Sequence, residues 1–464
     1  MFSLREAARE RGDAPAIVTK AGVLTFAELW QRARPVAQAL HASTAPQGVT
    51  AVVATLRLET LLAMYALVEL GVPVVPLHPR LTAVERSALV ELAGAERLLD
   101  ETWAPPDPAA LPDAEPPASV AEDEDPLAIL FTSGSSGTPK GVELSVRAFR
   151  ALAAASAANL GWKPGDRWLL CMPLGHVGGL SVVLRCLAAR VPVVLSPWTG
   201  AIGPLLEDID ALGASLLSLV PTMLARILEE APDYRFPPHV RAVLLGGDAA
   251  SPSLLAAARA RGISVLTTYG MTETCSQIAT LSPGEGASPE NGVGRPLQGT
   301  EVRIEGGEIQ VRGPTLFTRY VPAERWPSPF LPDGWFATGD LGRFDEAGRL
   351  HVIGRRSDLI ITGGENVDPR EVEVALMACA GVREACVFPT ADERWGQLVA
   401  AAVVLDPSAP PTVAAIVADV QQRLARHKWP RRMAICTELI LNATGKLDRR
   451  RTGAAVASAL VAVA

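Results

Sequence analysis

The sequence predicts an α/β protein with a large N-terminal domain and a smaller α+β domain after it. Residues 50–55 and 72–77 are strand-like runs on either side of a helix-like run at 58–70, and such a βαβ unit with parallel strands is typical of doubly wound subdomains. Beyond Gly294, short strands such as 301–304 alternate with Gly and Pro turns, which indicates a small β-barrel or sandwich. A chain of 464 residues is too long for one core, so at least two domains are expected.

The composition indicates a globular protein whose ligands are small molecules. Charged residues make up 20% of the chain and hydrophobic residues 48%. The formal net charge of −7 without a basic run argues against a nucleic-acid partner, and no cluster of Lys and Arg suggests binding to a membrane. Six cysteines without C-x-x-C spacing favour reduced thiols, and the charged N-terminus lacks a signal-peptide pattern, so we expect a cytoplasmic protein. No sequence signal indicates an oligomeric state.

Local patterns predict the remaining elements. Ser3 with Glu6, and Thr25 with Glu28, have the S/T-x-x-E spacing of a capping box, so a helix is expected to begin at each. Apolar runs predict further strands at 127–131, 142–144, 168–172, 215–220, 242–245 and 265–268, and a helix at 180–187. Near the C-terminus we expect helices at 370–377 and 412–426 and strands at 385–388 and 399–404.

A loop rich in Gly, Ser and Thr follows the strand at 127–131. Its glycines allow close backbone approach, its hydroxyl and N–H groups offer donors, and Lys140 supplies a cation, which together suit a polyphosphate. It is not a Walker A loop, because Pro139 precedes Lys140 and Gly141 follows it. The alternative is a flexible hairpin. The candidate phosphate-binding residues are Thr132, Ser133, Gly134, Ser135, Ser136, Gly137, Thr138 and Lys140.

Together with further motifs in the order expected, this loop resembles the signature of the adenylate-forming superfamily of acyl-CoA ligases, luciferases and peptide-synthetase adenylation domains. The motifs run from the loop to Lys446, about three quarters of the chain. The resemblance implies ATP and Mg²⁺ as ligands, coenzyme A as co-substrate, and a reaction that passes through an acyl-adenylate. It also implies an N-terminal ATP- and acyl-binding domain of residues 1–353, a hinge at 354–358, and a mobile domain of residues 359–464.

The resemblance implies a role for each matching residue. Tyr269 would stack on adenine, Thr272 would hold the α-phosphate, and Glu273 would bind the metal. The turn Gly246-Gly247-Asp248 would lie along the adenine and the acyl group, with Gly246 and Gly270 bordering the acyl pocket. The other implied nucleotide contacts are Thr268, Gly270, Met271, Asp340, which would bind the ribose hydroxyls, and Arg355.

The same resemblance implies the moving parts. Lys446 would be the mobile catalytic lysine, although a lysine near a C-terminus is ordinarily a solvated charge. Ser357 would be the hinge, at a position where many relatives have Asp or Lys, and Gly363 with Gly364 would face coenzyme A. His176 would lie between the nucleotide and acyl pockets and is counted with the catalytic candidates, against the plainer alternative of a satisfied loop histidine.

Arg185 stands inside the apolar run 180–187. Buried arginine costs several kcal/mol unless it is paired, so it must reach water, meet an acid, or await an anion. It follows His176 by nine residues, and no acid occurs between Gly175 and Leu205. We therefore assign Arg185 to the acyl pocket and expect a substrate acid with a second carboxylate. The alternatives are another aryl- or medium-chain acid, or an adenylation module that loads a carrier protein.

Overall fold

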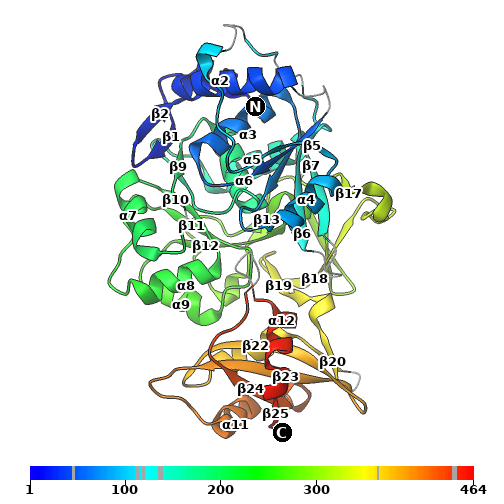
Figure 1. Ribbon diagram of the computed structural model, residues 1–464. Coiled ribbons are helices and arrows are strands. Elements are labelled where there is room, and N and C mark those ends of the chain that lie inside the picture. Colours follow the sequence, from blue (N-terminus) through cyan, green and yellow to red (C-terminus); the bar gives the residue numbers. More distant parts are fainter. Residues whose placement is uncertain are drawn as a thin grey trace. The chain divides into compact units, whose positions relative to one another are not determined.

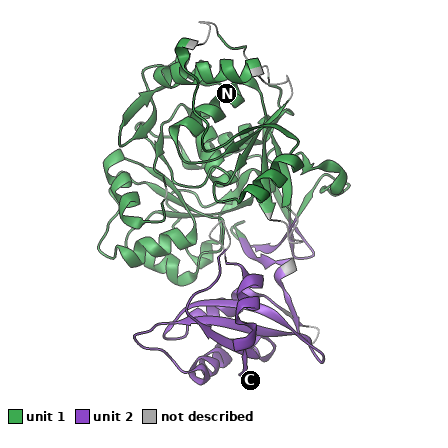
Figure 2. Cartoon of the chain, in the orientation of Figure 1, with its two compact units in different colours: residues 1–303, 310–337, 345–350 green, residues 304–309, 338–344, 351–464 purple. Residues whose placement is uncertain are grey.

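The computed structural model describes most of the chain and divides it into two compact units (Figures 1 and 2). Described are residues 1–43, 48–110, 115–117, 121–133, 139–197, 199–362, 365–441 and 447–463. The first unit comprises Met1–Arg303, Gln310–Ala337 and Asp345–Leu350, and the second comprises Ile304–Ile309, Thr338–Phe344 and His351–Ala464. The hinge expected at residues 354–358 stays a prediction.

A nine-stranded sheet forms the centre of the first unit. Its strands from β12 to β1 are parallel and its outer pairs antiparallel, so the predicted α/β class is confirmed. All four residues of β11 are buried, as expected for a strand covered on both faces. The order is β14 (Arg295–Pro296), β13 (Ser276–Thr280), β12 (Val265–Met271), β11 (Ala242–Leu245), β10 (Leu216–Leu219), β8 (Trp168–Leu170), β9 (Val193–Leu195), β1 (Pro15–Thr19) and β2 (Gly22–Thr25).

A second sheet of the first unit contains the predicted βαβ unit. Strands β3 and β4 are parallel and joined by helix α3, and strands β6 and β7 form an antiparallel hairpin. Gly71 ends α3 in the left-handed conformation, with φ of 68°. The order is β17 (Arg319–Val321), β7 (Pro139–Ser145), β6 (Pro126–Ser133), β4 (Val74–Leu77), β3 (Val49–Val53) and β5 (Ala95–Leu99).

Two helices of the first unit begin at the predicted capping boxes, whereas the helix expected at 180–187 is longer and spans Val177–Ala189. The Ser3 hydroxyl accepts a hydrogen bond from the Glu6 amide at 3.0 Å, and Thr25 and Glu28 exchange the two bonds of a capping box. No helix in the described ranges is both long and apolar enough to cross a membrane. The helices are α1 (Leu4–Arg11), α2 (Phe26–Ser43), α3 (Leu58–Leu70), α4 (Ala83–Leu92), α5 (Val146–Leu160), α6 (Val177–Ala189), α7 (Ile202–Leu212), α8 (Pro221–Glu230) and α9 (Pro252–Ala260).

Four of the strands after Gly294 form a four-stranded sheet. The sequence predicts a small barrel or sandwich there. The order of the sheet is β15 (Glu301–Glu305), β16 (Glu308–Arg312), β18 (Phe336–Phe344) and β19 (Leu350–Arg355). The last part of the chain is α+β, as predicted. It contains β20 (Ile360–Thr362), β21 (Glu365–Val367), α10 (Pro369–Met377), β22 (Val382–Asp392), β23 (Gly396–Leu405), α11 (Val413–Arg423), β24 (Arg432–Cys436), α12 (Arg449–Val456) and β25 (Val461–Ala462).

A largely buried ion pair joins the residues that lead into β8 and β11 in the first unit. Arg241 donates to both Asp166 oxygens at 2.8 and 2.6 Å, and Ser215 and the Lys163 amide donate to the same carboxylate. Burial alone raises the pKa of Asp166, yet the hydrogen bonds from Arg241, the Lys163 amide and Ser215 outweigh it and hold that pKa below its ordinary value.

We expect Asp166→Asn to lower the free energy of unfolding of the first unit by about 3 kcal/mol, because Arg241 would keep a buried charge without its partner. A carboxyl with a lowered pKa stabilises the folded state above its unfolded pKa of about 3.9. Calorimetry should therefore find a constant difference from wild type between about pH 7 and 5, which shrinks only as pH falls below about 4. Glu230→Gln, which breaks an exposed pair with Arg226, is the control and should change stability by less than about 1 kcal/mol. A difference that already shrinks above about pH 5 would contradict the lowered pKa.

Candidate active site

Several predicted site segments follow neighbouring parallel strands. Strands β8, β10, β11 and β12 run side by side in one direction, so their carboxyl ends lie at one edge of the sheet. His176 comes shortly after β8, Gly246–Asp248 come directly after β11, and Tyr269 and Gly270 lie on the last part of β12. Ligands of open α/β sheets bind at this edge. The structure thus gathers these predicted site residues of the first unit at one edge of the sheet.

The turn after β12 is held by an unusually close backbone approach. A Cβ atom on Gly270 would lie 1.5 Å from the Ser276 carbonyl oxygen, so glycine is required there. Cys275 and Ser276 have positive φ values of 52° and 92°. Thr274 closes the turn, because its hydroxyl accepts a hydrogen bond from the Met271 amide at 2.9 Å. The expected strand at 265–268 continues to Met271, since β12 pairs with β13 there.

Glu273 stands in the 3₁₀ turn Thr272–Thr274 that this arrangement presents. The Tyr320 hydroxyl donates to its carboxylate at 3.2 Å, and the Phe317 amide donates to its backbone carbonyl at 2.9 Å. Within the described ranges no group of three or more His, Cys, Asp or Glu side chains could hold a metal. One carboxylate suits Mg²⁺, which proteins usually bind through one or two carboxylates together with substrate phosphates. Glu273 therefore fits the predicted metal ligand.

The Gly246-Gly247-Asp248 turn packs directly on β12. A Cβ atom on Gly246 would lie 2.6 Å from Cγ2 of Thr268, and Gly247 has a φ of 85°. The Thr268 hydroxyl contacts the Thr280 hydroxyl at 2.8 Å and receives a hydrogen bond from the Gln277 amide. Thr268 therefore joins β12 to β13, and its predicted nucleotide contact stays a prediction.

His176 has a neighbour that sequence reasoning missed. Its ring centre lies 5.5 Å from that of His78, which follows β4 of the other sheet. A Cβ atom on Gly175 would lie 3.1 Å from the His78 amide nitrogen, so the two segments touch through their backbones. Burial lowers the pKa of His78, and the charge of Arg80 lowers it further. A neutral imidazole beside His176 is expected at pH 7.

Arg185 lies in α6 and is 3% exposed, so it does not reach water. Its Nη2 is 3.5 Å from the Ser276 hydroxyl, and its guanidinium carbon is 5.3 Å from the centre of the Trp168 ring. Among the described residues it forms no ion pair with a carboxylate, and the thiols of Cys275 and Cys186 are the groups that favour its charged form. Burial lowers the pKa of Arg185 to about 10, which leaves the group charged at pH 7.

The described ends of the phosphate loop lie on the hairpin of β6 and β7. The Thr132 hydroxyl donates to the Lys140 carbonyl at 3.5 Å, and Ser133 is the last residue of β6. The Lys140 ammonium lies over the rings of Tyr320 and Trp326. Gly134, Ser135, Ser136, Gly137 and Thr138 lie outside the described residues.

The second unit brings together two predicted nucleotide contacts. Asp340 is 5% exposed on β18, and its carboxylate accepts a hydrogen bond from Arg355 Nε at 3.0 Å. Ser357 belongs to the 3₁₀ turn Arg356–Asp358. Lys446, Gly363 and Gly364 lie outside the described residues, so their roles stay predictions.

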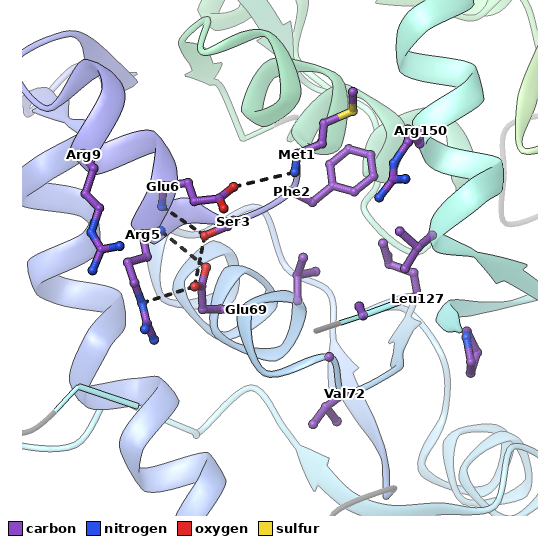
Figure 3. A pocket seen from close by; sticks show the side chains of 15 residues that line it. Met1, Phe2, Ser3, Arg5, Glu6, Arg9, Glu69, Val72, Leu127 and Arg150 are labelled. Atoms are coloured by element: carbon purple, nitrogen blue, oxygen red, sulfur yellow. Dashed lines mark hydrogen bonds and ion pairs between the residues drawn. The ribbon is translucent and has the colours of Figure 1, made fainter. Parts of the chain in front are cut away.

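A cavity of about 220 Å³ lies beside α1, and no predicted site residue lines it (Figure 3). Its buried acid, Glu69, accepts a hydrogen bond from the Ser3 hydroxyl and lies 3.4 Å from Arg5 Nε. Arg5 also pairs with Glu115. These charges tie the N-terminal segment to α3, so we assign the cavity to structure rather than to catalysis.

The fold and the strand-end residues define a nucleotide-binding α/β enzyme, and sequence comparison specifies the class. Residues 4–321 match the model of the AMP-binding enzymes, and residues 371–446 match that of the AMP-binding enzyme C-terminal domain. The chain belongs to the AMP-binding enzyme family.

Named relatives are similar over nearly the whole chain. The 2-succinylbenzoate–CoA ligase of Bacillus licheniformis is 36% identical and covers 97% of this chain and 98% of its own length. That of Bacillus subtilis is 35% identical, with 94% of each chain covered. The solved structure of o-succinylbenzoate CoA synthetase from Bacillus subtilis, in complex with the acyl-adenylate intermediate, has a TM-score of 0.87 at 34% identity and 97% coverage of both chains.

We expect Gly270→Ala to weaken ATP binding at least about ten-fold, because the new methyl group would open the turn that carries Tyr269 and Glu273. Titration calorimetry measures the dissociation constant. Gly203→Ala is the matched control, since a Cβ atom there meets nothing within 4 Å. Unchanged ATP affinity in a folded Gly270→Ala protein would show that this turn does not bind the nucleotide.

Proposed function

We propose that this protein is an ATP-dependent acid–CoA ligase, which converts 2-succinylbenzoate, ATP and coenzyme A to 2-succinylbenzoyl-CoA, AMP and pyrophosphate in menaquinone biosynthesis. The family and the relatives named 2-succinylbenzoate–CoA ligase support the reaction. A cytoplasmic location is proposed with it, because all six cysteines are free thiols.

The environment of Arg185 is the observation that supports 2-succinylbenzoate as the substrate. The guanidinium is buried, so it does not snorkel to water, and it forms no ion pair with a carboxylate of the described residues. Of the three ways to accommodate a buried arginine, the capture of an anion remains. 2-Succinylbenzoate has two carboxylates, one that is activated and one that must be held. A guanidinium holds a carboxylate with two parallel hydrogen bonds, whereas a simple fatty or benzoic acid offers no second group.

In the first half-reaction, an oxygen of the substrate carboxylate attacks the α-phosphorus of ATP and pyrophosphate leaves. Both reactants are anions, so the site must supply positive charge where negative charge grows. Glu273 would hold Mg²⁺, which supplies such charge to the phosphate oxygens. Thr272 would hold the α-phosphate, Lys446 would neutralise the developing charge, and the loop from Thr132 to Lys140 would bind the departing phosphates.

In the second half-reaction, the thiol of coenzyme A attacks the acyl carbon and AMP leaves. A rotation at Ser357 would withdraw Lys446 and bring Gly363 and Gly364 to the site. Asp340 would hold the ribose in both steps, and its ion pair with Arg355 would order the carboxylate for that task. His176 would separate the nucleotide from the acyl group.

The reaction itself is tested by mass spectrometry. We expect the wild-type protein, given ATP, Mg²⁺, coenzyme A and a mixture of acids, to form 2-succinylbenzoyl-CoA in preference to thioesters of benzoate and medium-chain acids. A preference for a monocarboxylate would refute the substrate but not the ligase. Formation of acyl-adenylate without any thioester would favour the alternative, a module that loads a carrier protein.

We expect Arg185→Ala to raise KM for 2-succinylbenzoate strongly, because a charged hydrogen-bonded contact worth on the order of 2–4 kcal/mol is lost, while KM for ATP stays nearly constant. Arg185→Lys should restore little, because a point charge does not reproduce the guanidinium fork. Arg226→Ala, which removes an exposed helical arginine, is the control. Undiminished use of the dicarboxylate by Arg185→Ala would overturn the assignment of this residue.

A further inference from the structure

Tyr320 joins two residues of the nucleotide site that are far apart in the sequence. Its hydroxyl donates to Glu273 Oε1 at 3.2 Å, and the Lys140 ammonium lies 4.9 Å from the centre of its ring. One side chain thus contacts both the predicted metal ligand and the cation of the phosphate loop. No pattern in the sequence singles out Tyr320 for such a role.

The backbone holds Tyr320 in this position. Strand β17 pairs with β7 so that Tyr320 is opposite Val142 and Val321 is opposite Gly141. A Cβ atom on Gly141 would lie 3.1 Å from Val321 Cβ, so the two strands are packed closely and a side chain there would have to push its neighbour away by a few tenths of an ångström. The Phe317 ring packs on the Tyr320 ring, with centroids 4.8 Å apart. The phenol therefore stands on a fixed element.

Trp326 completes the surroundings of the lysine. The Lys140 ammonium lies 4.3 Å from the centre of the Trp326 ring, and the Tyr320 and Trp326 ring centres are 6.2 Å apart. An ammonium over aromatic faces is attracted by their negative potential, but it keeps its hydrogen-bond donors for another acceptor. The two rings thus restrict the position of the Lys140 ammonium but do not neutralise its charge.

We propose that Tyr320 is a positioning residue of the nucleotide site. Its hydroxyl orients the Glu273 carboxylate toward Mg²⁺, and its ring, together with that of Trp326, holds Lys140 in place for the phosphates of ATP. This inference rests on the proposed function, since it takes Glu273 as the metal ligand and Lys140 as a phosphate ligand. The hydroxyl and the aromatic rings have separate tasks, and two substitutions, one at Tyr320 and one at Trp326, test these tasks separately.

The test is the calorimetric affinity for ATP, measured with Mg²⁺ and again with EDTA, which does not require turnover. Tyr320→Phe keeps the ring and removes the hydroxyl. We expect the gain in ATP affinity that Mg²⁺ provides to fall about ten-fold, because a hydrogen bond to a charged group is lost, while the affinity in EDTA stays unchanged. Trp326→Leu should show the reverse pattern, with an affinity in EDTA about three-fold weaker and an unchanged gain from Mg²⁺.

Tyr234→Phe is the matched control, because the Tyr234 hydroxyl also donates to a carboxylate, that of Asp210, at 2.7 Å. It should alter neither affinity. Subtracting the fluorescence of Trp326→Phe from that of wild type gives the emission of Trp326 alone among the nine tryptophans. We expect this emission to change when ATP is added.

If Tyr320→Phe keeps the full gain from Mg²⁺, or if it weakens ATP binding equally with Mg²⁺ and with EDTA, the positioning role is refuted and the hydroxyl serves packing alone. A different result is expected if the proposed function itself is wrong. In that case the wild-type protein itself would form no acyl-adenylate from ATP and 2-succinylbenzoate, whatever the behaviour of the Tyr320 variant.

Discussion

The close approach of Gly270 to the Ser276 carbonyl is the constraint that positions both Glu273 and the Ser276 hydroxyl. It forces the chain into a turn so tight that Cys275 and Ser276 adopt positive φ values. On one side the turn presents Glu273 to Tyr320, and on the other the Ser276 hydroxyl lies 3.5 Å from Arg185. A single backbone feature thereby positions both Glu273, the proposed metal ligand, and the hydroxyl beside Arg185, the proposed substrate ligand.

The charges around this turn match a reaction between anions. Arg185 is a cation whose described surroundings are thiols, an indole and a hydroxyl. Lys140 is held by aromatic rings, which attract a cation without neutralising it. By contrast, Arg241 is paired with Asp166 on both oxygens. Arg241 therefore serves the fold, whereas Arg185 is the cation that we propose for substrate binding.

Much of the fold could be predicted because it depends on local patterns. The capping boxes at Ser3 and Thr25 and the βαβ unit around α3 follow from short stretches of sequence. The contacts of His78 with His176 and of Tyr320 with Glu273 join segments that are far apart in the chain, so no periodicity reveals them. The helix expected at 412–426 ends at Arg423, because Leu424 adopts an extended conformation that the apolar pattern does not encode.

Arg185 is proposed to bind the second carboxylate of the substrate. A crystal structure of this protein with the adenylate of 2-succinylbenzoate tests this proposal most directly. We expect the carboxylate that is not activated to lie within hydrogen-bond distance of the guanidinium, about 2.7–2.9 Å from two of its nitrogens. A carboxylate that points to solvent or to another residue, with Arg185 still in contact only with Ser276 and Trp168, would contradict it.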